Sequence, residues 1–283
     1  MALNLDMLGK SLGPVHNSWR SKDTILYALS VGSGIEEIAF TTENSQGIPQ
    51  RVLPTFSVVG GGPNSMDIWD QIGSFDHSQL LHLEQSVNIF ASLPPAADVE
   101  TTALVTGIYD RITGATIEVK FITKDSQSDK VLFETASTVF IRGEGSFGGP
   151  RGTRVKAVAV PEREPDFVIT YETFPTQALL YRLNGDDNPL HSDPAFARAA
   201  GFDRPILHGL CTYGFAGRAL LSTCCEMDTD RFGSMSARFV APVFPGDLLT
   251  TTIWNGDDGA VFVVENQVGA TVLDRGRFTV RES

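Results

Sequence analysis

The chain has 283 residues, 42% of them hydrophobic and 20% charged, which is typical of a globular protein with a sizeable core. Its 22 basic and 34 acidic side chains give a net charge of −12, which argues against nucleic acid or an anionic membrane as the main partner. An odd number of cysteines, no leader-like start and no apolar run of membrane-spanning length lead us to expect a cytoplasmic protein.

The first half of the sequence ends in four strand-like runs that are rich in β-branched and aromatic residues. They lie at residues 86–92, 102–109, 115–122 and 131–141. A dense set of glycines and prolines follows and predicts a linker. We therefore expect an N-terminal half over residues 1–142, a linker over 143–164 and a C-terminal half over 165–283.

A glycine-rich motif opens this linker. Residues 143–148 match the dinucleotide-binding pattern G-x-G-x-x-G and follow a strand-like run. A dinucleotide site requires a helix directly after the motif. Residues 149–152, Gly-Pro-Arg-Gly, cannot start a helix, so the motif does not indicate a nucleotide. We expect no cofactor.

The second half carries the sequence Tyr-Arg-Leu-Asn-Gly-Asp-Asp-Asn-Pro-Leu-His at residues 181–191. Its many turn-forming residues predict a loop. Such a loop can hold a water molecule between Asp186 and His191, because a carboxylate and a neutral imidazole can share the protons of water near neutral pH. Asn188 can orient a neighbour by hydrogen bonding. The alternative is a plain surface turn.

The same loop crowds four potential metal ligands, Asp186, Asp187, His191 and Asp193. Carboxylates with a single histidine suit Mg²⁺ or Mn²⁺ better than Zn²⁺. The sequence offers no second histidine-rich cluster to complete a ligand set, so we predict that the site binds no metal.

Two helices are expected after the loop. The first covers residues 193–200, with Asp193 as its N-cap and Gly201 as its stop. The second begins at Gly209, because apolar residues recur at helical spacing over residues 210–224. Glycine and alanine are frequent in this second helix, which predicts that a sheet approaches its backbone closely on more than one side.

The start of the second helix is itself a candidate for chemistry. A helix start offers backbone N–H groups without helical partners, and these can stabilise a developing oxyanion. The alternative is that Gly209 serves only tight packing. A water activator and an oxyanion hole together suffice to add or remove water next to a thioester carbonyl. The sequence has no G-x-S-x-G motif, so the usual serine-hydrolase nucleophile is missing.

The chain ends with another series of strand-like runs, and residues 255–259 between two of them carry a hairpin turn signal. Each half thus consists of a helical part followed by an antiparallel meander, which indicates an internal duplication of the fold. We predict an α+β protein with a double hot-dog fold, that is, two repeats in each of which a curved antiparallel sheet wraps a long helix. The four runs lie at residues 234–244, 248–254, 260–267 and 271–280.

Residues 181–212 closely resemble the R-specific enoyl-CoA hydratase 2, or MaoC-like dehydratase, family, including the hydratase 2 unit of peroxisomal multifunctional enzymes type 2 and stand-alone bacterial relatives. The resemblance covers nearly the whole chain. It implies a double hot-dog fold and the reversible syn hydration of a trans-2-enoyl-CoA to a (3R)-3-hydroxyacyl-CoA in β-oxidation. Further segments in family order are residues 53–56, 81–85, 145–149, 237–239 and 242–246.

The resemblance also implies the roles of four residues in the second half. Asp186 and His191 match the catalytic pair that binds the water. Asn188 matches the residue that maintains this geometry, and Gly209 matches the glycine of the oxyanion hole. Which of Asp186 and His191 moves which proton stays open, and the two groups can titrate as one unit.

Four substrate contacts are implied as well, at His82, Leu83, Arg111 and Phe239. Two of them depart from the family pattern, since glycine is common at the position of Leu83 and lysine at that of Arg111. Arginine keeps the positive charge but offers a planar fork in place of a point charge.

The resemblance assigns the degenerate N-terminal half to the acyl chain, which can be long or bulky, such as a fatty or steroid side-chain acyl group. It implies a homodimer that binds CoA thioesters. Two other functions are compatible with a hot-dog fold, namely an acyl-CoA thioesterase and a non-catalytic acyl-CoA-binding module. The loop at residues 181–191 argues against the thioesterase, and the complete set of Asp186, Asn188, His191 and Gly209 argues against the binding module.

Overall fold

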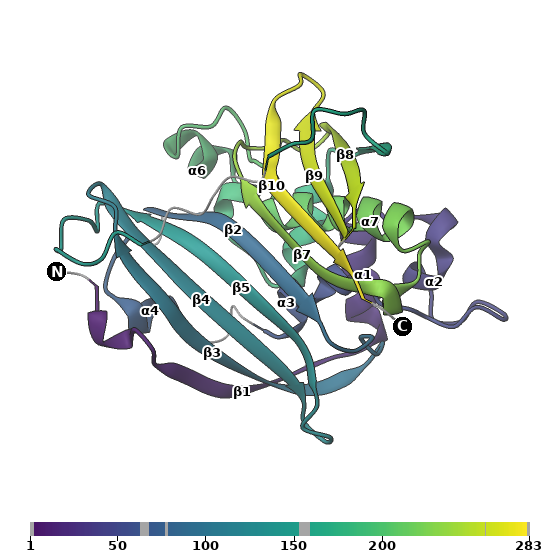
Figure 1. Cartoon of the computed structure of the whole chain (residues 1–283), viewed down its shortest axis with the longest axis horizontal. Coiled ribbons are helices and arrows are strands. Elements are labelled where there is room, and N and C mark those ends of the chain that lie inside the picture. The colour runs from purple at the N-terminus through teal and green to yellow at the C-terminus, as the bar shows by residue number, and fades with distance from the viewer. Residues whose placement is uncertain (1–2, 63–67, 77–78, 153–158, 258, 282–283) are drawn as a thin grey trace.

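The computed structural model describes residues 3–62, 68–76, 79–152, 159–257 and 259–281. Within these ranges, ten antiparallel strands form one sheet, in the order β1-β3-β4-β5-β2-β7-β10-β9-β8-β6 (Figure 1). The strands are β1 (Ser11–Trp19), β2 (Leu80–Ile89), β3 (Ala97–Asp110), β4 (Gly114–Asp125), β5 (Val131–Arg142), β6 (Phe167–Glu172), β7 (Phe232–Phe239), β8 (Leu248–Gly256), β9 (Gly259–Asn266) and β10 (Thr271–Val280).

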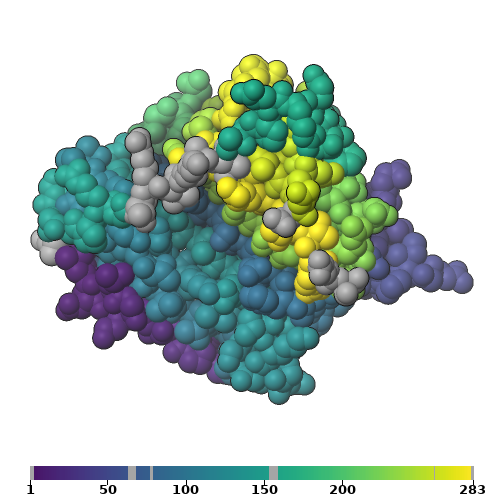
Figure 2. Space-filling view, in the orientation of Figure 1, coloured from purple at the N-terminus to yellow at the C-terminus, as the bar shows by residue number. Residues whose placement is uncertain are grey.

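The two halves of the sheet repeat one topology. Read from its outer edge strand to the centre of the sheet, the first half has the order β1-β3-β4-β5-β2. Read in the same way from the opposite edge, the second half has the order β6-β8-β9-β10-β7. Strands β2 and β7 join the halves, with paired residues from Glu84 and Arg238 to Asn88 and Ser234. This repetition confirms the internal duplication and the α+β double hot-dog fold expected from the sequence. Figure 2 shows the halves in broad contact.

All eight strand-like runs of the sequence are strands in the structure, with shifted ends. The sequence analysis did not predict β1 and β6, which are the two edge strands of the sheet. Strand β1 contains Gly13 and Pro14, and proline is tolerated in a sheet mainly at an edge, where its missing N–H costs no ladder bond. The hairpin between β8 and β9 closes with Gly256 opposite Gly259, at the predicted turn.

The helices differ between the halves. The second half contains the long helix α7 (Gly209–Cys224), as expected. Among its described residues, the first half has only short helices at the corresponding place. The prediction of a long helix in each repeat was therefore wrong. Pro54 begins this segment and three glycines at residues 60–62 end it, and glycine disfavours a helix. The other α-helices are α1 (Ser21–Ser30), α2 (Ile38–Thr41), α3 (Ser57–Gly60), α4 (Ile68–Ile72), α5 (Gln177–Tyr181) and α6 (Pro194–Ala199).

Helix α7 is central to the main hydrophobic core, which contains side chains from both halves. The two glycines inside the helix, Gly214 and Gly217, face the first half. A Cβ atom on Gly214 would lie 2.5 Å from Cγ1 of Val31, and one on Gly217 would lie 2.4 Å from Cγ2 of Thr55. The prediction that a sheet requires these glycines was therefore incomplete, because segments next to α1 and α3 make the closest approach.

The glycine-rich motif after β5 has a structural role. The backbone N–H groups of Ser146 and Gly148 donate to the carboxylate of Asp110, at 2.9 and 2.8 Å. A third bond from the N–H of Ile112 is the largest cause of the lowered pKa of Asp110. No helix follows the motif in the described residues up to 152. These N–H groups thus bind an internal carboxylate. The absence of a cofactor stays a prediction.

None of the helices in the described part of the chain is long and apolar enough to cross a membrane.

Candidate active site

The loop predicted to hold water lies between α5 and α6 and is built from two short 3₁₀ turns, η6 (Arg182–Asn184) and η7 (Pro189–His191). Asn188 caps η7, since its side-chain oxygen accepts the N–H of Leu190 at 3.0 Å. The carboxylate of Asp186 accepts the N–H of Asn188 at 3.3 Å. These two local bonds fix the path of the chain between Asp186 and His191.

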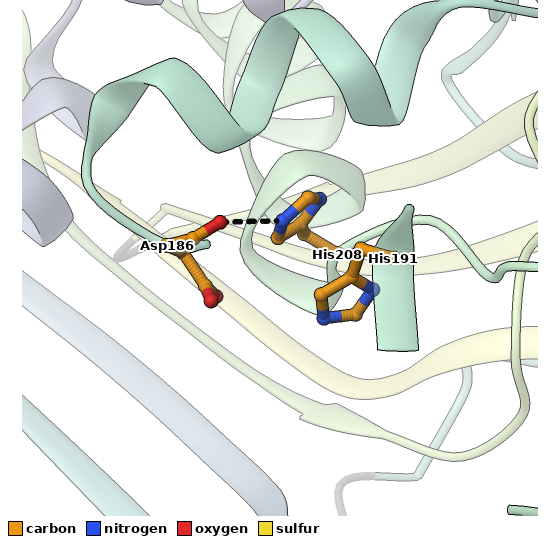
Figure 3. A group of neighbouring side chains, drawn as sticks. All are labelled: Asp186, His191 and His208. Carbon is orange, nitrogen blue, oxygen red and sulfur yellow. Dashed lines mark hydrogen bonds between the residues drawn. The ribbon is translucent and has the colours of Figure 1, made fainter. Parts of the chain in front are cut away.

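The His191 ring has a defined tautomer. Its Nδ1 lies 2.9 Å from the carbonyl oxygen of Ile206, which can only accept, so Nδ1 carries the proton. Nε2 is then a free acceptor, and Figure 3 shows this nitrogen on the same side as the Asp186 carboxylate. Burial lowers the pKa of His191, although the bond to Ile206 and the charge of Asp186 oppose this shift. The ring is therefore neutral at neutral pH.

His208 joins this pair, which the sequence analysis did not foresee. One ligand atom each from Asp186, His191 and His208 lie within 4.8 Å of one another. The His208 ring is stacked on His191, with ring centroids 3.7 Å apart, and its Nε2 donates to the main-chain carbonyl of Asp186 at 3.2 Å. Because 22 residues separate His208 from Asp186, their spacing in the sequence does not indicate a contact. The remaining sequence signal is that histidine is unusual at the N-cap of a helix.

The arrangement suits a water better than a metal ion. The His208 nitrogen that faces Asp186 is engaged by the main-chain carbonyl, and the other nitrogen points away (Figure 3). Asp193, one of the four potential ligands in the sequence, caps α6 by accepting the N–H groups of Ala195 and Phe196. The absence of a metal stays a prediction.

Gly209 is the first residue of α7, so helix geometry leaves its N–H without an intrahelical acceptor. Gly209 also lines the cavity described below. A Cβ atom at this position would lie 3.0 Å from the Phe239 ring. Glycine thus keeps the N–H accessible where Phe239 leaves little room.

A cavity of about 490 Å³ connects these residues. Asp186, Asn188, His191 and Gly209 all line it, and its remaining walls are mostly apolar and come from both halves. The first half contributes the inner face of its sheet and the helices beneath it. The residues from the first half are Val58, Val59, Trp69, Leu80, Leu81, His82, Leu83, Gln85, Phe121, Thr135, Ser137 and Val139.

Three of the four expected substrate contacts lie at this cavity. His82, Leu83 and Phe239 line it, and the rings of His82 and Phe239 are in contact at 4.8 Å between centroids. Arg111 is not among the described lining residues. Its exposed guanidinium donates to Thr116 and to the carbonyl of Arg151, at the turn between β3 and β4. A role for Arg111 toward CoA stays a prediction.

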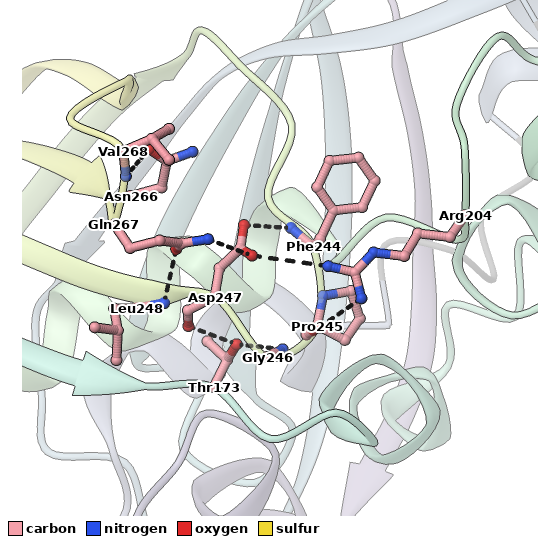
Figure 4. Close-up of polar contacts among 10 residues, drawn as sticks. All are labelled: Thr173, Arg204, Phe244, Pro245, Gly246, Asp247, Leu248, Asn266, Gln267 and Val268. Atoms are coloured by element: carbon pink, nitrogen blue, oxygen red, sulfur yellow. Dashed lines mark hydrogen bonds and ion pairs between the residues drawn. The ribbon is translucent and has the colours of Figure 1, made fainter.

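A buried carboxylate braces the segment that orients His191. Asp247 accepts the N–H of Phe244 at 2.9 Å and the side-chain amide of Gln267 at 2.9 Å, and Arg204 lies beside it (Figure 4). The braced loop over residues 242–247 binds the neighbouring segment through Leu207, whose N–H donates to the carbonyl of Val243 at 2.7 Å. The carbonyl of Ile206, which orients His191, is thereby held in place.

The double hot-dog fold of this chain is that of the MaoC-like class of proteins. The family model for a MaoC like domain matches residues 156–275, and that for an MFE-2 hydratase 2 N-terminal domain matches residues 18–143. The chain belongs to this hydratase 2 and MaoC-like dehydratase family.

Individual relatives support the same family. The chain is 44% identical to 3-hydroxyacyl-thioester dehydratase Y of Mycobacterium tuberculosis, over 94% of this chain and 92% of that protein. It is 36% identical to a probable enoyl-CoA hydratase 2 of Dictyostelium discoideum, over 95% and 94%. The crystal structure of a MaoC-like dehydratase from Phytophthora capsici matches with a TM-score of 0.88 and 31% identity, over 99% of both chains.

Proposed function

We propose that the protein catalyses the reversible hydration of trans-2-enoyl-CoA to (3R)-3-hydroxyacyl-CoA in acyl-chain β-oxidation. One observation carries this proposal: two acceptors, the carboxylate of Asp186 and Nε2 of His191, face the same cavity as the N–H of Gly209. The acceptors can bind the two protons of one water. The N–H can bind the thioester oxygen. The names of the relatives, enoyl-CoA hydratase and 3-hydroxyacyl-thioester dehydratase, support the same reaction.

In the addition direction, the water oxygen attacks C3 of the enoyl group while Asp186 and His191 hold its protons. Electrons of the double bond move toward the thioester, whose oxygen gains negative charge against the N–H of Gly209. The proton taken from the water then passes to C2 on the same face, so that one O–H bond breaks while a C3–O bond and a C2–H bond form. Asp186 and His191 act as one unit in this transfer.

We place the acyl group in the first half of the chain. The apolar walls that β2, β4 and β5 contribute to the cavity support this placement. The division of labour is then an acyl-accommodating half over residues 1–142, a linker over 143–164 and a catalytic half over 165–283. We expect turnover to improve from a short to a long or steroid-type enoyl-CoA, and a preference for crotonyl-CoA would contradict the placement.

The reaction is tested by incubating the protein with crotonyl-CoA and with a longer enoyl-CoA. Loss of the enoyl thioester absorbance without release of free thiol is the expected result. Release of free CoA would instead identify a thioesterase, and binding without any change in the thioester would identify a non-catalytic acyl-CoA-binding module. Chiral analysis of the product tests the (3R) configuration.

Replacing Asp186 by Asn removes one of the two acceptors, and we expect kcat to fall by about 10²- to 10⁴-fold. The neighbouring Asp187 is exposed and is not among the described lining residues, so D187N is the matched control with near-native kcat. Circular dichroism of both variants checks that the fold is intact. Comparable kcat values for D186N and D187N would contradict the role of Asp186.

We also propose an oligomeric state, a cellular environment and independence of metals and cofactors. The resemblance predicts a homodimer, which sedimentation equilibrium tests. Three free thiols, at Cys211, Cys224 and Cys225, support the expected reducing, cytoplasmic environment. We expect full activity in the presence of EDTA and without any added cofactor.

A further inference from the structure

His208 occupies a position that its residue type does not explain. It precedes the first residue of α7 and is only 1% exposed. Histidine is not a favoured N-cap, and its side chain makes no capping bond to the described residues of the helix. The reason for a buried imidazole must therefore lie in its other contacts.

These contacts all lead to the catalytic loop. The Nε2–H of His208 donates to the main-chain carbonyl of Asp186 at 3.2 Å. One face of its ring stacks on His191, at 3.7 Å between centroids and an interplanar angle of 28°. Tyr181 packs against the ring at 4.9 Å. One side chain thus fixes the backbone of Asp186 and the ring plane of His191 together.

Burial keeps this imidazole neutral. The pKa of His208 is lowered to about 3, mainly by burial and in addition by the neighbouring His191. A neutral imidazole has one N–H, and the bond to the Asp186 carbonyl requires it on Nε2. Because both imidazole rings are neutral, the stack and the hydrogen bond are compatible at neutral pH.

We propose that His208 is a positioning residue, which holds the Asp186 backbone and the His191 ring so that both side chains bind the same water. This inference rests on the proposed hydration reaction. His208 itself lies behind His191 and transfers no proton. Its loss should therefore lower kcat more than it changes KM, since misplacement of catalytic groups by about 1 Å costs on the order of 100-fold.

Two variants separate the hydrogen bond from packing. H208F retains an aromatic ring for the stack but loses the N–H, and we expect kcat to fall by about 10- to 100-fold with KM changed less than about threefold. H208Q offers an amide N–H at a similar reach and should recover part of this loss. H16F, at an exposed histidine of β1, is the matched control. Native kcat in folded H208F would overturn the proposal.

A second measurement does not depend on activity. In H208A, water replaces the stacked ring, so the pKa of His191 followed by NMR should rise toward its ordinary value. If the native protein hydrates no enoyl thioester, the proposed function falls, and this titration alone decides the positioning role. An unchanged titration of His191 in H208A would then overturn it.

Discussion

Gly209 meets two requirements at the level of a single residue. Its backbone N–H is free of helical partners, and its missing side chain leaves room for the Phe239 ring. The first requirement concerns chemistry and the second concerns space, and separate substitutions can distinguish them. Proline removes the N–H but is favoured at the first position of a helix, and the extended ψ of 134° at His208 suits the residue before proline.

We therefore expect G209P to fold and to lose about 10²- to 10³-fold in kcat, the usual loss for one oxyanion donor. G209A is the matched control, because it adds a Cβ near Phe239 and keeps the N–H. Steady-state kinetics with one enoyl-CoA compare the two. Equal kcat values in G209P and G209A would show that the N–H does not act on the thioester oxygen.

His208 also makes stability depend on pH. Its folded pKa of about 3 lies below the ordinary 6.5, so the unfolded chain binds more protons between these values. Its contribution is complete above pH 6.5 and is lost as the pH falls toward 3. From pH 7.5 to pH 5 this residue alone should reduce the free energy of unfolding by about 2 kcal/mol.

Urea unfolding at the two pH values measures this effect. H208Q cannot titrate and should show the smaller decrease of the two proteins. H16Q, at an exposed histidine, should follow the native protein. A pH dependence of H208Q equal to that of the native protein would contradict the assignment.

At the level of elements, close neighbours in the first half explain why α7 has glycines at positions 214 and 217. A glycine inside a helix costs about 1 kcal/mol relative to alanine, yet a Cβ atom on Gly217 would overlap Cγ2 of Thr55. Overpacking costs about 1–3 kcal/mol. We expect the overlap to exceed the gain in helix propensity, so G217A should destabilise the protein by about 1 kcal/mol.

T55S removes the overlapping methyl group and is the matched test. The double variant T55S/G217A should be more stable than the sum of the single changes predicts, with a coupling of about 1–2 kcal/mol in urea unfolding. Additive effects would mean that Gly217 is not required by contact with Thr55.

The sequence predicted those elements whose signals are local. Asp193 caps α6, and its accepted N–H groups lie only two and three residues away. The loop from Asp186 to His191 was found for the same reason. Strand β1 escaped prediction because Pro14 is acceptable only through its position at the sheet edge. His208 escaped because its partners are set by tertiary packing.

At the scale of the whole molecule, a buried ion pair between Arg218 and Glu37 contributes to the contact between the halves. Arg218 of α7 donates to both carboxylate oxygens of Glu37, at 3.0 and 2.7 Å, and also to the carbonyl of Val31. Its guanidinium lies 4.4 Å from the centre of the Tyr171 ring. The side chains of Arg218 and Glu37 are only 5% and 14% exposed, so solvent screens their attraction little.

E37Q should destabilise the protein by about 3–5 kcal/mol, because it leaves the buried Arg218 charge without its counter-ion. D98N breaks the pair of Arg20 and Asp98, whose side chains are more than half exposed, and should cost at most about 1 kcal/mol. Urea unfolding of the two variants gives the comparison. Since the pair crosses between the halves, E37Q should also make the enoyl-CoA cavity less well ordered and raise KM, which D98N should leave unchanged. Equal stability of E37Q and D98N would show that the Arg218–Glu37 pair stabilises the protein no more than an exposed ion pair does.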